Sequence, residues 1–115
     1  MKNDKYASHN DESLLIGLRE GDLAAFNILY HKYWSVLLDE SYKRLEDLAS
    51  CEEIVQDIFI DLWKHCSNRE IHNVEAYLFT CMKYKVFETY KKNRRRTVLI
   101  EENPSYYQRQ DGTEG

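Results

Sequence analysis

Residues 73–96, NVEAYLFTCMKYKVFETYKKNRRR, form one uninterrupted stretch whose character changes halfway along. In the first half, apolar residues recur at helical spacing, and Asn73 is placed to cap a helix that no Gly or Pro interrupts. These apolar positions are Val74, Tyr77, Leu78, Cys81 and Met82. In the second half, residues 83–96 carry seven basic side chains and one acid. The stretch therefore predicts a helix that starts in a core and ends as a basic surface.

The basic half also contains aromatic rings, because Tyr84, Phe87 and Tyr90 stand among the lysines and arginines. Cations interleaved with aromatics suit a phosphate backbone and unstacked bases. At 1.5 Å per residue such a helix spans roughly 34 Å, so one end can lie in a bundle while the other contacts nucleic acid. The competing interpretation is a solvated basic helix end that complements the helix dipole.

Two helices are predicted in the first part of the chain. Asn10 or Asp11 can cap the first, Gly21 is placed to end it, and Asp22 caps the second. We expect an irregularity in the second helix near Ser41 or Asp47. The apolar faces consist of Leu14, Leu15 and Leu18 in the first helix and Phe26, Leu29, Tyr30, Tyr33, Leu37, Leu38, Tyr42, Leu45 and Leu48 in the second.

A third helix is predicted from Ser50, since Ser50 and Glu53 fit a capping box. Its core face consists of Ile54, Val55, Ile58, Phe59, Leu62 and Trp63. The other side carries Glu53, Gln56, Asp57 and Ile60 at i, i+3, i+4 and i+7, a row that we call the acidic stripe. The stripe is either a binding surface or a solvated face with one stray Ile, because single exposed apolar residues need no explanation.

These patterns predict an all-α fold, a small bundle of four helices whose last member is long and basic at its C-terminal end. A chain of 115 residues is long enough for one domain with its own core. We expect that core to centre on Phe26, Leu37, Ile58, Phe59, Leu62 and Leu78. Residues 1–9 are expected to be a flexible tail, residues 10–96 the helical domain, and residues 97–115 a linker or disordered tail.

The net charge of -4 conceals an uneven distribution of charge along the chain. Residues 39–70 carry nine acids and four bases, whereas residues 83–96 carry a net charge of +6. An acidic body with a basic end indicates two binding surfaces of different kinds.

Several classes of site and of protein are not expected. Three cysteines without a CxxC motif indicate neither a disulfide framework nor a zinc site, and His65, Cys66 and His72 lack a fourth ligand at suitable spacing. The cysteines are Cys51, Cys66 and Cys81. No cofactor, metal or enzymatic activity is expected, because the chain has no Gly-rich phosphate loop, HExxH or nucleophile motif. It also has no signal peptide and no run of ~20 apolar residues, so we expect a cytoplasmic protein without membrane insertion.

Three segments of the chain, in this order and at these separations, resemble region 2 of bacterial sigma factors of the extracytoplasmic-function (ECF) class. They are DESLLIGLREGDLAAFNILYHKYW, EEIVQDIFIDLW and AYLFTCMKYKVFETYKK. The resemblance covers roughly residues 11–96. It implies a transcription initiation module that binds RNA polymerase core and promoter DNA, and it implies an anti-sigma factor as a further partner.

The resemblance also implies which residues contact each partner. In that family the third helix docks on the clamp helices of the largest polymerase subunits, and the matching positions here are Glu53, Gln56, Asp57 and Ile60. The loop before the last helix, with that helix, captures the non-template strand of the promoter minus-ten element as the duplex opens. The matching positions are Ser67, Asn68, Arg69, Asn73, Tyr77, Lys83, Tyr84, Lys85, Glu88, Lys91 and Lys92.

The chain departs from the family pattern in two ways. Lys83 and Tyr84 stand where many members have Arg-Asn, and Glu88 stands for an Asp, which affects the expected base preference. After Arg96 nothing has the length or pattern of region 4, the family's second DNA-binding domain, so we expect an excised fragment or a protein that works without it. The alternative function is a helical protein-interaction domain that sequesters a regulator and whose basic tail is only solubilising. Nucleic-acid affinity that falls steeply with salt separates the two.

Overall fold

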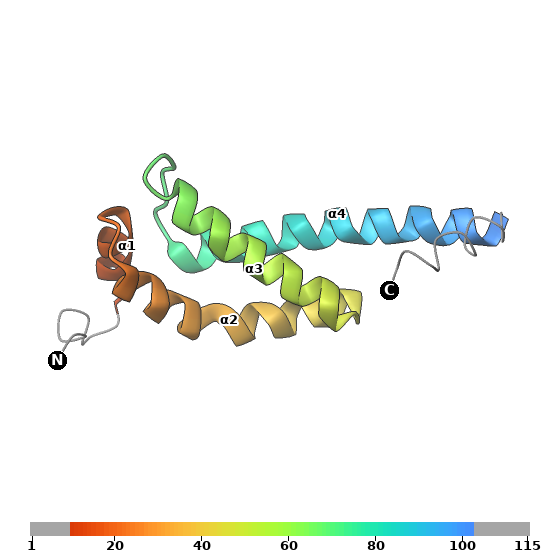
Figure 1. Cartoon of the computed structure of the whole chain (residues 1–115), viewed down its shortest axis with the longest axis horizontal. Helices are drawn as coiled ribbons and strands as arrows, with labels where there is room; N and C mark the ends of the chain where they lie inside the picture. Colours follow the sequence, from red (N-terminus) through yellow and green to blue (C-terminus); the bar gives the residue numbers. More distant parts are fainter. Residues whose placement is uncertain (1–9, 103–115) are drawn as a thin grey trace.

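The computed structural model describes residues 10–102, and the side chains as far as Arg96. It contains four helices, α1 (Asp11–Arg19), α2 (Leu23–Leu45), α3 (Leu48–His65) and α4 (Val74–Glu102) (Figure 1). Within residues 10–102 no strand is present. The predicted all-α bundle of four helices is therefore confirmed. The predicted tails, residues 1–9 and most of 97–115, lie outside the described residues.

The turn between α1 and α2 forms as its sequence predicts. The Asn10 side chain caps α1 by accepting hydrogen bonds from the backbone N–H groups of Glu12 and Ser13. At the other end Gly21 has a φ of 78°, and the Asp22 N–H donates to the Gly17 carbonyl at 3.0 Å. This closes the α1 C-terminus in a Schellman motif, for which a residue with positive φ is required. The Asp22 carboxylate then caps α2 by accepting from the Ala24 N–H at 3.0 Å.

The core lies where all four helices meet, with α2 packed against each of the other three. Five of the six residues expected at its centre are buried, and Phe26 lies half-buried at its edge. The buried five are Leu37, Ile58, Phe59, Leu62 and Leu78. Two further buried residues, Ile71 and Val86, come from segments whose polar composition hid them. The core therefore extends further along α4 than the sequence indicated.

The junction of α2 and α3 differs from the prediction. Glu46 adopts a left-handed conformation with a φ of 55°, which ends α2, and α3 begins at Leu48 with Asp47 in the N-cap position. The predicted capping box at Ser50 and Glu53 is therefore wrong. Ser50 lies inside the first turn, where its hydroxyl donates to the Asp47 carboxylate at 2.7 Å. Because the chain turns at Glu46, the apolar face predicted to run on through Leu48 is interrupted.

Three residues predicted to face the core are exposed instead. Tyr42 and Leu48 lie beside the α2–α3 turn, and they are 47% and 52% exposed. Trp63 is 39% exposed and packs against the Phe26 ring with 5.2 Å between ring centroids. Trp63 and Phe26 thus close the edge of the core.

Helix α4 is the longest element, and its 29 residues span about 43 Å at 1.5 Å per residue. It begins at Val74 beside the loop, where the Asn73 side chain accepts from the Ala76 N–H at 2.9 Å, as predicted. It runs beyond the predicted end at Arg96 as far as Glu102. The C-terminal part of α4 continues past the ends of α2 and α3, which leaves it accessible (Figure 1).

Candidate polymerase and nucleic-acid surfaces

The four residues of the acidic stripe lie on the exposed face of α3. Glu53, Gln56, Asp57 and Ile60 are all exposed, Ile60 to 48%, while Ile58 and Phe59 on the opposite side are buried to 1% exposure. Within the part of the chain whose side chains are described, the three polar members make no side-chain hydrogen bond or ion pair. The stripe therefore presents two carboxylates, an amide and an apolar side chain to solvent.

The connection between α3 and α4 is tied down at several points. Ile71 is buried to 4% exposure and anchors the loop in the core. The guanidinium of Arg69 donates to the Tyr77 hydroxyl at 2.6 Å, which joins the loop to the first turn of α4. That bond raises the pKa of Arg69, and burial raises the pKa of Tyr77 while the Arg69 bond acts against the rise. Both groups therefore keep their protons at neutral pH.

The outer surface of the loop is polar and open. The side chains of Ser67, Asn68 and Arg69 are exposed, and the Asn68 N–H donates to the His65 carbonyl at 3.0 Å in a turn. A buried anchor with exposed amide, hydroxyl and guanidinium groups around it can present hydrogen-bonding groups to a ligand without folding on binding. Of the predicted DNA-contacting residues, the structure brings Arg69 into contact with Tyr77, and Lys91 into contact with Glu88.

Helix α4 presents aromatic rings and cations together along its exposed side. Tyr84, Phe87 and Tyr90 are 66%, 56% and 51% exposed. The Lys91 ammonium lies 5.0 Å from the centroid of the Phe87 ring and 3.7 Å from the Glu88 carboxylate. Exposed large rings on a helix that is otherwise charged are costly to hydrate, and stacked bases or apolar side chains would cover them.

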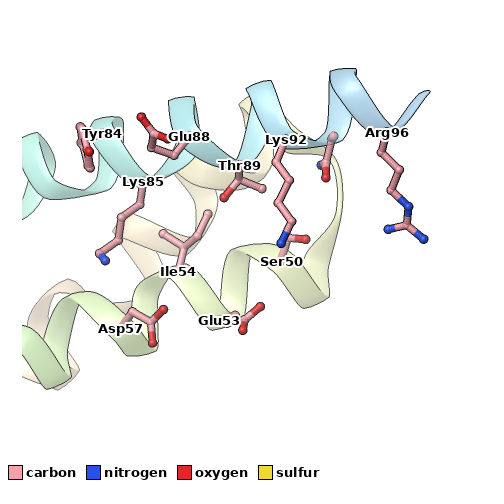
Figure 2. Close-up of a pocket in the computed structure, with 11 residues that line it drawn as sticks. Ser50, Glu53, Ile54, Asp57, Tyr84, Lys85, Glu88, Thr89, Lys92 and Arg96 are labelled. Atoms are coloured by element: carbon pink, nitrogen blue, oxygen red, sulfur yellow. The ribbon is translucent and has the colours of Figure 1, made fainter. Parts of the chain in front are cut away.

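A groove between α3 and α4 brings the two predicted surfaces together (Figure 2). Glu53 and Asp57 line it from α3, and Tyr84, Lys85, Glu88 and Lys92 line it from α4. Figure 2 shows Lys85 and Lys92 extending from α4 toward α3. The acidic stripe and the basic helix, which the sequence presents as separate surfaces, thus share an edge. Gln56, Ile60 and the loop residues do not line the groove.

One cation of α4 is already paired across this interface. The Lys85 ammonium lies 3.5 Å from the Asp61 carboxylate of α3, and the two side chains are 29% and 41% exposed. Sequence reasoning missed Asp61, although it follows Asp57 at i+4 and so extends the acidic row by one turn. It also missed Arg19 of α1, whose side chain donates to backbone carbonyls of the loop. An arginine at a helix C-terminus carries no signal for such a distant contact.

Among the residues that the structure describes, no group of three His, Cys, Asp or Glu side chains is placed to hold a metal ion. The thiol of Cys66, once considered with His65 and His72, is buried and points to the Leu18 carbonyl at 3.7 Å. In the described part of the chain, no helix combines the length and the apolar character needed to cross a membrane.

The domain is thus all-helical, with an exposed acidic face on α3 and a basic, aromatic face on α4. Comparison with known families identifies the class: the model of sigma-70 region 2 matches residues 29–96, more than half of the chain. The chain belongs to the sigma-70 region 2 family. Members of this family are non-enzymatic transcription factor domains that bind RNA polymerase and take part in promoter melting. No curated protein and no solved structure matched the chain.

Proposed function

We propose that this domain is an ECF-class initiation module that binds RNA polymerase core through the acidic stripe and captures the non-template strand of the minus-ten element with its loop and α4. The proposal assigns residues 10–96 to one functional domain in the cytoplasm, with an anti-sigma factor as a regulatory partner. It combines the family membership with the exposure of most of the residues that the ECF resemblance nominates, Tyr77 and Lys85 being half-buried.

The observation that carries the proposal is the arrangement of groups along α4 and the loop before it. An anchored loop with exposed polar side chains stands at the N-terminal end of the helix, and exposed cations and rings follow along it. A base taken out of the stack needs polar groups that read its edge and an apolar or aromatic wall. The neighbouring phosphates need cations. The loop supplies the polar groups, and α4 supplies the aromatic wall and the cations.

The proposed polymerase contact rests on the exposed carboxylates of the acidic stripe, which are unpaired among the described side chains. Because Glu53 and Asp57 are exposed and have no cationic partner within the described side chains, a basic surface on another protein can pair with them. Ile60, half-exposed beside them, adds the apolar contact that the centre of an interface requires. A double charge reversal, Glu53→Lys with Asp57→Lys, is expected to abolish retention of RNA polymerase core on the immobilised domain.

The matched control reverses two other exposed acids, Asp39→Lys with Glu52→Lys, which adds the same charge outside the stripe. Exposed substitutions change stability by about 0.5 kcal/mol or less, so both variants should keep the helical circular dichroism of the native domain. Polymerase retained equally by both double variants would reject the assignment of the stripe.

The DNA contact is tested by separating phosphate binding from base reading. Lys83→Ala and Lys91→Ala are expected to weaken binding to single-stranded oligonucleotides of every sequence, since cations that meet phosphates carry no sequence information. Substitutions at Ser67 or Asn68 are expected to change which base is preferred. Absence of any salt-dependent nucleic-acid binding would instead support the alternative, a domain that sequesters a protein regulator.

A further inference from the structure

The C-terminus of α1 holds the α3–α4 loop through one side chain. Arg19 donates from Nε to the Cys66 carbonyl at 3.4 Å and from Nη2 to the Ile71 carbonyl at 3.2 Å and the Arg69 carbonyl at 3.5 Å. The three carbonyls are spread over the loop from its beginning to its buried anchor. A single guanidinium therefore spans the segment whose exposed side chains are proposed to read a base.

The position of Arg19 is itself fixed. It is the last residue of α1, and the Schellman motif that follows it is closed by hydrogen bonds to the Gly17 and Leu18 carbonyls. The Cys66 thiol lies 3.7 Å from the Leu18 carbonyl, which brings the start of the loop against the same helix end. Leu18 is buried to 2% exposure, so α1 cannot shift without disturbing the core. The guanidinium thus acts from a rigid platform.

The contact is suited to holding a loop in one conformation. A guanidinium presents five N–H donors in a fixed fork, so it can bind several carbonyls at once, which a lysine ammonium on its flexible stem does less well. A recognition site discriminates well only when its groups are held in place before the ligand arrives. Without Arg19, the three loop carbonyls would accept hydrogen bonds from water instead, and the side chains of Ser67, Asn68 and Arg69 would sample more positions.

We propose that Arg19 is a positioning residue that sets base discrimination by fixing the α3–α4 loop, without itself contacting DNA. This inference rests on the proposed strand-capture function. Arg19 lies before residue 29, where the family match begins, so the match does not describe this contact. A purely structural role would lower the stability of the fold, whereas a positioning role lowers selectivity in a domain that stays folded.

The test compares Arg19→Gln with Arg44→Gln. Arg44 is a matched control because it also lies in the last turn of a helix and also donates to a backbone carbonyl, that of Glu40 at 2.7 Å, but it is remote from the loop. Each variant is incubated at low salt with a randomised single-stranded DNA library, and the bound fraction is sequenced. The readout is the enrichment of the preferred base over the mean of the other three at the most selective position.

We expect Arg19→Gln to lower this enrichment at least threefold, while total binding of the unselected library and its salt dependence stay within twofold of the native domain. Arg44→Gln should match the native domain in both. Native enrichment in the Arg19→Gln domain would overturn the inference. If Arg19→Gln loses helical circular dichroism, Arg19→Lys decides, because it keeps the cation and lacks the fork, and native enrichment in that folded variant would equally overturn it.

A second readout needs no DNA. Arg69 lies in the loop, and trypsin cleaves after it faster when the loop opens more often. We expect faster cleavage at this bond in Arg19→Gln than in Arg44→Gln, and equal rates would contradict the positioning role. If the native domain selects no base at all, the strand-capture proposal fails, and the cleavage rates still show whether Arg19 holds the loop.

Discussion

Replacing Phe59 with Ala should remove the largest fully buried side chain of the core. Phe59 is 1% exposed and packs against the Tyr30 and Phe26 rings, with centroid distances of 5.0 Å and 6.2 Å. Substitution of a buried Phe by Ala costs about 3–5 kcal/mol, and the cost depends on how far the site can collapse. Because Tyr30 and Phe26 are half-buried and can move inward, we expect the lower end, about 3 kcal/mol.

A loss of this size is a large part of the stability of a small domain, which is about 5–15 kcal/mol. It corresponds to a fall in melting temperature of roughly 12–24 °C, at about 4–8 °C per kcal/mol for a domain of this size. The control is Gln56→Ala on the exposed side of α3, which should change stability by less than about 0.5 kcal/mol. Thermal unfolding followed by circular dichroism measures both. Melting temperatures within a few degrees of each other would mean that α3 faces the other way.

Three further predictions follow from single contacts. Asp61→Asn should free Lys85 to bind phosphate, so anisotropy titrations should show an affinity for single-stranded DNA raised by at most about fivefold and a steeper salt dependence. An unchanged affinity would show that the ion pair does not restrain Lys85. Gly21→Ala should destabilise the domain by about 1–2 kcal/mol in urea unfolding and Gly21→Asn by less, because the added Cβ meets no atom and only the positive φ opposes it. Burial, with the hydrogen bond to Asp11, raises the pKa of Tyr33, so folding favours the protonated phenol and the stability of the domain should fall as pH rises above about 10. Tyr33→Phe should reduce this loss of stability, and an equal loss in that variant would contradict the role of Tyr33.

The bundle itself could be predicted from sequence because its helices carry regular apolar faces between recognisable caps. Leu29, Tyr33 and Leu37 recur at helical spacing, and Asp22 and Asn73 are residues whose side chains accept from free N–H groups at a helix start. The turn at Glu46 agrees with the irregularity expected near Ser41 or Asp47, but the sequence did not decide between these two places. A glutamate carries no preference for positive φ, and the apolar spacing continues through it to Leu48.

The sequence analysis also did not predict the burial of two core residues that stand in polar segments. Ile71 stands in a loop of polar residues, where no periodic pattern predicts burial. Val86 continues the row of Val74, Leu78 and Met82 by one more i+4 step, but it stands among lysines and was assigned to the basic half of the helix. They are buried because α4 and its preceding loop happen to lie against the other helices there. Tertiary packing, which no local pattern encodes, decides a position such as Ile71.

For the candidate site, composition predicted the basic and aromatic character of α4, and spacing predicted that the acidic stripe would be exposed. The contacts between elements could not be predicted in the same way. The pairing of Lys85 with Asp61 and the reach of Arg19 to the loop join residues far apart in sequence. Each of these side chains, considered alone, is an ordinary charged residue on a helix surface.

The claim that this domain captures a single strand is tested most directly by comparing its affinity for single-stranded and duplex DNA of the same sequence. Opening a duplex costs a few kcal/mol per base, and stacking a base on an aromatic ring returns only about 1–3 kcal/mol, so the isolated domain should not melt DNA. Fluorescence anisotropy at roughly 50 and 200 mM salt should show weak binding to the single strand that falls as salt rises, and weaker binding to the duplex. Tighter binding to intact duplex than to the single strand would contradict strand capture, even though the sigma-70 region 2 fold would stand.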